Sequence, residues 1–162
     1  MPHFKADLKP LMLRVFDLLP AMVFIKDAKT LRYKLVNREV ERVFGQPCEA
    51  WVGKTVHEMF SADAAEIHDR NDRKTLAHGN VLTFPEIAVD TASGQRRWYH
   101  TRIIPVDAAA GGLLVGIAQD ITPQREAQTL LAESESKYRI LVELSPYAIL
   151  VHSEEVYVFA NQ

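Results

Sequence analysis

The sequence predicts an α+β domain built on an antiparallel sheet. Two strand candidates stand near the start of the chain, a helical stretch follows, and three further strand candidates come after it. Strands and helices that are segregated in this way favour an antiparallel sheet packed against helices over alternating βαβ units. The 162 residues are 48% hydrophobic and 25% charged, which is typical of a globular domain.

The first elements are predicted from spacing and from turn residues. Apolar residues recur at helical intervals over 7–19, and Pro20 ends that helix. The apolar run 21–25 and the alternating segment 31–36 predict two strands that form a hairpin. Asn37 predicts the N-cap of a short helix, because its side-chain oxygen can accept a hydrogen bond from a free backbone N–H.

The later elements follow from the same kinds of pattern. Short helical turns over 47–60 precede a longer helix over 61–78, which Gly79 ends. From Thr122 to Leu144 the chain is charged and contains no glycine, so we expect one continuous helix. Its heptad-like apolar positions fit either a weak dimer seam or a solvated connector. Three strands are predicted between these two helices: 81–89, 96–106 and 113–119.

Composition narrows the function classes. The formal net charge of −2 gives no electrostatic footprint for nucleic acid. No apolar run approaches the roughly 20 residues that span a bilayer, so no membrane insertion by this chain is expected. The single cysteine, Cys48, cannot build a disulfide framework and fits a reducing compartment. We therefore expect a cytoplasmic protein.

Four segments of the chain, in this order and spacing, resemble the PAS family. The first strand lies in Leu19-Pro20-Ala21-Met22-Val23-Phe24-Ile25-Lys26-Asp27, and the second ends in Val36-Asn37. Gly53 precedes a short helix that ends in Met59-Phe60. The last strand finishes in Asp120-Ile121-Thr122, which is similar to the exit triplet of the family.

This resemblance implies a five-stranded antiparallel sheet in the order 2-1-5-4-3, with the helices between Asn37 and His78 on one face. An echo of the first hairpin, in which 145–151 repeats the style of 19–25, predicts that a second module begins near the C-terminus. Four parts are therefore expected: an N-terminal amphipathic helix (1–19), a PAS sensor domain (20–122), a connector helix (123–144) and the truncated start of a second PAS domain (145–162).

No catalytic motif stands out, so we expect no enzyme within this chain and no metal site. Haem-binding members of the family carry an axial histidine in a register similar to that of His68. The charged residues that follow His68 favour a histidine on a solvated helix face, however, and no haem is expected. Cys48 lacks the sequence context of the photosensory members, so no flavin is expected either. The candidate lining of a ligand pocket is Phe24, His68, Phe84, Tyr99, Thr101 and Ile117.

The function that the resemblance implies is a sensory module of a larger signalling protein. A small molecule or another cue would shift the sheet, and the connector would carry the shift to an output domain beyond the C-terminus, with Asp120 and Thr122 as relay residues. We expect a homodimer formed through the N-terminal helix and the sheet. The parent protein is expected to be a sensor histidine kinase of a two-component system, or next a diguanylate cyclase. The first alternative is a PAS scaffold that binds no ligand and only dimerises, and the second is a haem-based gas sensor.

Overall fold

The computed structural model describes residues 8–107, 112–147, 149–153 and 156–160, with side chains described up to residue 149. The described residues up to Ile121 form one compact unit, and those from Thr122 onward form a second. The first unit holds the sheet and five helices.

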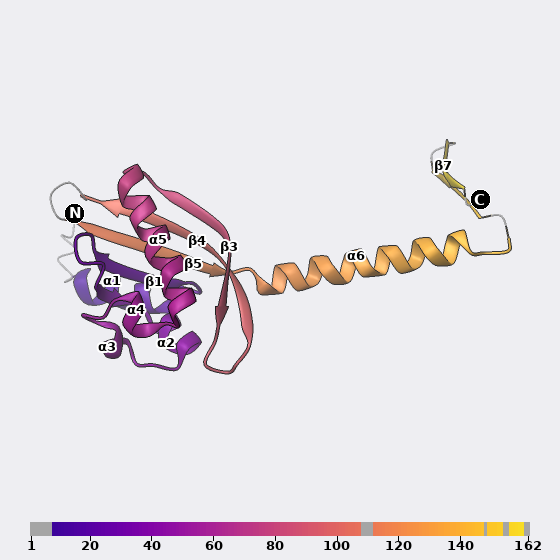
Figure 1. The fold of residues 1–162 in the computed structure, drawn as a ribbon. Coiled ribbons are helices and arrows are strands. Elements are labelled where there is room, and N and C mark those ends of the chain that lie inside the picture. The colour runs from indigo at the N-terminus through magenta and orange to yellow at the C-terminus, as the bar shows by residue number, and fades with distance from the viewer. Residues whose placement is uncertain (1–7, 108–111, 148, 154–155, 161–162) are drawn as a thin grey trace, which may run out of the picture. The chain divides into compact units, whose positions relative to one another are not determined.

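The first unit is built on a five-stranded antiparallel sheet (Figure 1). Its strand order is β2-β1-β5-β4-β3, which confirms the predicted order 2-1-5-4-3. The first and the last strand of this sheet, β1 and β5, therefore pair at its centre, where Phe24 lies opposite Gly116. The strands are β1 (Met22–Asp27), β2 (Tyr33–Val36), β3 (Leu82–Asp90), β4 (Arg96–Val106) and β5 (Leu113–Asp120).

Strand β3 lies at an edge of the sheet and contains Pro85. The register against β4 shifts between Phe84 and Ile87, on either side of that proline. Proline lacks the N–H that a central strand would need, so an edge strand with an irregular register is where it is tolerated.

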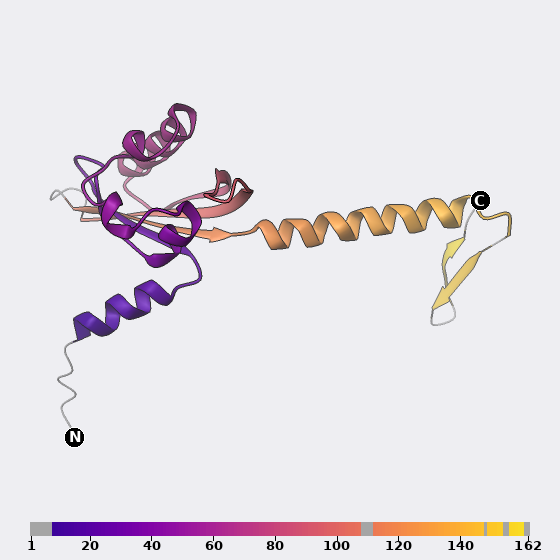
Figure 2. The ribbon, with the colours of Figure 1, turned by 90° about the horizontal axis from the view of Figure 1, so that it is seen from below.

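One face of the sheet is covered by the helices that follow β2. Alternation along β4 and β5 turns Tyr99, Thr101, Leu114 and Ala118 toward this face, where they are buried. Figure 2 shows that α5 lies over this face and that α1 lies on the other side of the sheet. The helices of the unit are α1 (Leu8–Leu18), α2 (Arg38–Phe44), α3 (Cys48–Trp51), α4 (Val56–Met59) and α5 (Ala62–His78).

Asn37 begins α2 as predicted, but the role predicted for its side chain is wrong. The side chain makes no capping hydrogen bond. Its Oδ1 accepts from the Val23 N–H at 2.9 Å, and its Nδ2 donates to the carbonyls of Phe16 (3.1 Å) and Ala21 (2.9 Å). The fully buried Asn37 side chain therefore connects the end of α1 and the start of β1 to α2, and it gives three backbone groups a hydrogen-bond partner.

The second unit consists of one helix and a hairpin. Helix α6 (Thr122–Glu143) runs without a break, as predicted, and none of its residues is buried. Strands β6 (Leu150–Ser153) and β7 (Val156–Ala160) pair antiparallel. That this hairpin opens a second PAS module stays a prediction, and Asn161 of the predicted echo lies outside the described residues.

Candidate functional site

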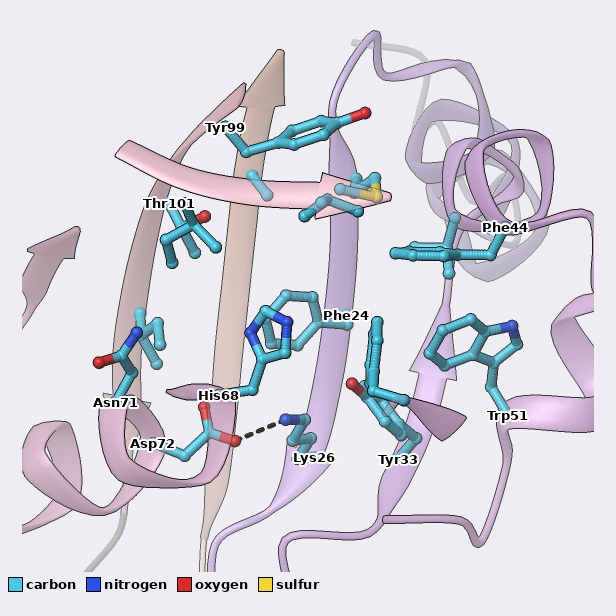
Figure 3. A pocket seen from close by; sticks show the side chains of 17 residues that line it. Phe24, Lys26, Tyr33, Phe44, Trp51, His68, Asn71, Asp72, Tyr99 and Thr101 are labelled. Carbon is cyan, nitrogen blue, oxygen red and sulfur yellow. Dashed lines mark hydrogen bonds and ion pairs between the residues drawn. The ribbon is translucent and has the colours of Figure 1, made fainter. Parts of the chain in front are cut away.

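A cavity of about 50 Å³ lies between the inner face of the sheet and α5 (Figure 3). One part of its wall is aromatic and comes from Phe24, Phe44, Trp51 and neighbouring apolar residues. The other part is polar and comes from β1, α5 and β4. We call this part the polar wall and define it as Lys26, His68, Asn71, Asp72 and Thr101.

An ion pair between β1 and α5 lies in the polar wall. Lys26 Nζ is 2.5 Å from Asp72 Oδ2, and both side chains are almost completely buried, at 1% and 2% exposure. The ammonium also lies 4.5 Å from the centroid of the Tyr33 ring and 5.1 Å from that of Phe24. Two aromatic faces and one carboxylate thus surround a charge that has lost its water.

Burial acts on both partners of the pair. It lowers the pKa of Lys26, and the negative charge of Asp72 partly opposes this. It raises the pKa of Asp72, and the positive charge of Lys26 partly opposes that. Burial therefore favours the neutral form of each side chain, and the opposite charge of its partner counteracts this effect.

The aromatic part of the wall is centred on Trp51. The ring of Trp51 meets those of Phe44 at 5.1 Å, Tyr33 at 5.2 Å and Phe60 at 5.7 Å between centroids. Mostly edge-to-face contacts of this kind are the favoured geometry of aromatic pairs. They form a rigid apolar surface opposite the polar wall.

His68 is not on a solvated helix face, and that prediction is wrong. Its imidazole lines the cavity and packs against Phe60, with 4.8 Å between the ring centroids. Burial and then the charge of Lys26 lower the pKa of His68 to about 4, so the ring is neutral at pH 7. The charges that follow it in the sequence alternate around the helix: Asn71 and Asp72 turn inward with His68, whereas Arg70 and Arg73 are exposed.

The structure brings four of the six predicted pocket residues to the cavity: Phe24, His68, Tyr99 and Thr101. Phe84 lies outside the lining and packs against the hydrophobic core beside it. Ile117 is misassigned, because it is 38% exposed and faces the other side of the sheet. Period-two alternation explains this, since its neighbours Gly116 and Ala118 turn inward.

Sequence reasoning missed Lys26, Trp51, Asn71 and Asp72. Lys26 follows an apolar strand without a break, and Asp72 stands inside a run of charges. Their pairing spans 46 residues, and no local pattern predicts it. His68, Asn71, Asp72 and Thr75 are spaced three or four residues apart and therefore share one face of α5. This spacing is the sequence signal that could have indicated that the face is turned toward the sheet.

A wider open groove of about 730 Å³ adjoins the cavity. The two share the side chains of Phe44, Phe60, His68, Ile87 and Val89. The packed rings of Phe60 and His68 therefore border both the cavity and the open groove.

Asp120 is connected to the cavity through the sheet. Its Oδ2 accepts a hydrogen bond from Arg97 Nη1 at 2.9 Å, and Asp120 lies opposite Tyr99 in the β4–β5 register. Burial and the Asp120 charge raise the pKa of Tyr99 to about 12. Since Tyr99 lines the cavity and Thr122 begins α6, Asp120 stands between the cavity and the following helix in the chain.

The other candidate chemistry is absent from the part of the chain that the structure describes. No group of three or more His, Cys, Asp or Glu residues there could hold a metal ion. Burial raises the pKa of the Cys48 thiol to about 11, which keeps it protonated and unreactive at pH 7. None of the described helices is long and apolar enough to cross a bilayer.

A five-stranded antiparallel sheet with helices over one face, and a cavity between the sheet and these helices, makes the first unit an α+β domain. The chain belongs to the PAS fold family, whose model matches residues 16–126.

One curated relative and two solved structures illustrate the likeness. The methanogenesis regulatory histidine kinase FilI of Methanothrix harundinacea (strain 6Ac) is 29% identical over 160 residues, covering 86% of this chain and 18% of the kinase. The RpfR quorum-sensing receptor PAS domain of Cronobacter turicensis, in complex with BDSF, is 23% identical with a TM-score of 0.54, covering 64% of this chain and 96% of that one. A Vibrio cholerae VqmA dimer is 21% identical with a TM-score of 0.61, covering 74% and 53%. At these identities the two solved structures show the fold alone.

Proposed function

We propose that this chain is the sensory module of a larger signalling protein, and that it binds a small molecule in the cavity beneath α5. The observation that carries the proposal is the polar wall, because a core built only for stability would fill this space with apolar side chains. PAS relatives with small-molecule ligands, such as the RpfR domain with BDSF, support it.

Native mass spectrometry of the protein purified from its own cells tests this proposal. We expect a bound small molecule that is released on denaturation. Ala118→Leu, which adds volume to the cavity lining, should remove the adduct. Ile117→Phe, on the neighbouring residue that faces away, should retain it. An adduct that survives Ala118→Leu, or none in any preparation, would contradict ligand binding in the cavity.

The small volume of the cavity favours a second candidate function, a scaffold that binds no ligand and only dimerises. In that case Ala118→Leu would leave signalling by the parent protein unchanged. If the module is a sensor, the same variant would fix the output in one state.

We also propose that α1 forms a homodimer contact, with help from the sheet. All described residues of α1 are at least partly exposed, including Leu11, Met12, Val15 and Leu18. Apolar exposure of this extent marks an interaction surface. Met12→Glu should lower the sedimentation coefficient to that of a monomer, whereas Val52→Glu, at an exposed apolar residue after α3, should not. A Met12→Glu dimer as stable as the wild type would contradict this contact.

Asp120 and Thr122 are the proposed relay to α6 and to an output domain. A continuous helix transmits rotation, so one Gly inserted near Leu131 would turn everything downstream by about 100°. Output of the parent should change sharply and should recover when the insertion is completed to a heptad. If the output of the parent does not depend on the length of the insertion, α6 is only a passive tether.

We propose no cofactor for the cavity and no catalysis by this chain. A haem or a flavin would have to displace the Lys26–Asp72 pair and the Trp51 cluster from a space of about 50 Å³. Freshly purified protein should show no Soret or flavin absorbance. A Soret band that His68→Ala removes would instead make His68 an axial ligand.

The parent protein and its location are also proposals. The chain spans 18% of the length of the histidine kinase relative, so a histidine kinase output acting in the cytoplasm is inferred from that relative and from the lone cysteine.

A further inference from the structure

The polar wall contains hydrogen-bonding groups that the protein leaves unused. Among the described residues, neither the Asn71 side-chain amide nor the Thr101 hydroxyl has a hydrogen-bond partner. Both residues line the cavity and are strongly buried, at 8% and 6% exposure. A buried polar group without a partner costs about 1–3 kcal/mol, so native proteins keep few of them. Asn71 and Thr101, together with the Trp51 indole N–H, which also has no partner in the described part of the structure, point to a ligand in the cavity.

The charge of the cavity is already balanced. Lys26 and Asp72 neutralise each other, and Asp69 and Arg73, which lie on the outward side of α5, form their own ion pair at 2.6 Å. The neighbouring rings of Tyr33 and His68 carry no charge at pH 7. An ionic ligand would bring a buried charge that has no counterion, which is far more costly than burying a neutral polar group.

Asp72 indicates in addition that the ligand carries a hydrogen-bond donor. Its Oδ2 is engaged by Lys26, whereas its Oδ1 accepts no hydrogen bond from the described residues. A ligand donor such as an amide N–H or a hydroxyl can bond to this acceptor. The aromatic wall opposite, with Phe24 and Trp51, suits a short alkyl group.

We propose that the cavity binds a small uncharged molecule in which an amide or a hydroxyl is joined to a short apolar group. The polar end contacts Asn71, Thr101 and Asp72, and the apolar end contacts the aromatic wall. The ligand enters from the open groove past Phe60 and His68, which border both spaces. This inference rests on the proposed sensory function and specifies its ligand.

A matched set of ligands tests the proposal. Propionamide, propionate and propylammonium have similar size and differ in charge. Each is titrated into the ¹⁵N-labelled full chain at pH 7, with backbone amide shifts as the readout. We expect propionamide to shift the amides of Asn71 and Thr101 in a saturable manner, and each ion to bind at least tenfold more weakly.

Two variants locate the site. Asn71→Leu and Thr101→Val keep the approximate shape of the side chain, and each should weaken propionamide binding at least tenfold. Thr83→Val, at an exposed residue of β3, is the matched control and should bind as the wild type does.

The outcomes separate this inference from the proposed function. If an ion binds as well as propionamide, and Ala118→Leu abolishes its binding, the neutral-ligand inference is wrong and the sensory function stands. If propionamide binds but is unaffected by both wall variants, the assigned contacts are wrong. If no member of the set binds the cavity, the inference is overturned, and the native adduct then decides the sensory function by itself.

Discussion

Helices α5 and α6 are both long and rich in charge, yet the structure uses them differently. Helix α5 buries Ala65, Asn71, Asp72 and Thr75, and it forms one wall of the cavity. Helix α6 buries no residue and leaves Leu131 and Leu141 exposed. Charge content therefore does not distinguish a helix that lines a cavity from a helix that buries no residue. What places Asp72 of α5 in the interior is its buried ion pair with Lys26 of β1.

The largest change in the free energy of unfolding should come from breaking the ion pair between Lys26 and Asp72. Asp72→Ala leaves the Lys26 charge buried without a counterion, which should lower the free energy of unfolding by about 3–5 kcal/mol in urea titrations. The matched control on α5 is Asp69→Ala. Because the Arg73 partner of Asp69 is exposed, this substitution should lower the free energy of unfolding by about 1 kcal/mol or less. Lys26→Met combined with Asp72→Leu should recover most of the loss. Equal losses for the two single variants would show that the pair has no special role.

The next effect is a pH dependence specific to His68. The folded protein holds this ring neutral with a pKa of about 4, whereas the unfolded chain takes up a proton near 6.5. Between these values the unfolded state binds more protons, so the His68 contribution to the free energy of unfolding falls as pH is lowered from 6.5 to 4, by up to about 3 kcal/mol.

The raised pKa of Asp72 acts in the opposite direction, so the measured quantity is the difference between the wild type and His68→Gln across this pH range. An NMR titration of the ring gives the pKa directly. A pKa near 6.5 would mean that His68 lies on a solvated helix face, as its neighbours in the sequence predicted.

A smaller effect is expected where the sheet leads into α6. Asp120→Ala removes an ion pair with the partly exposed Arg97 and should cost about 1 kcal/mol or less. Output of the parent protein should nevertheless lose its response to the cue. An unchanged response would remove Asp120 from the relay.

The smallest effect should come from α6 itself. Leu131→Ser should change the free energy of unfolding of the sheet domain by no more than about 0.5 kcal/mol, because no packing is lost at an exposed residue. Thermal unfolding followed by circular dichroism is sufficient to measure this. A large loss would show that α6 packs against a surface on which the sheet domain depends.

Much of the fold could be predicted because local patterns carry it. The strands alternate, glycines end α2 and α5 in the left-handed conformation, and the observed strand ends lie within about two residues of the predicted ones. The strand order came from the resemblance to the PAS family rather than from these patterns.

The candidate site was predicted less well, because it depends on contacts between distant residues. The pairing of Lys26 with Asp72, the three hydrogen bonds of Asn37 and the inward turn of His68 all join segments with no local signal for each other. Ile117 was misassigned for a simpler reason, because alternation gives two faces of a strand but does not say which one is covered.

The central claim is that Asn71 and Thr101 of the polar wall serve a ligand rather than the stability of the fold. The free energy of unfolding of Asn71→Leu, measured without ligand, tests it most directly. If the Asn71 amide awaits a ligand, an apolar side chain of similar size should leave the protein as stable as the wild type or more so, as is common where function and stability oppose each other. A loss of more than about 2 kcal/mol would mean that the amide already has its partners within the protein, and would contradict the account.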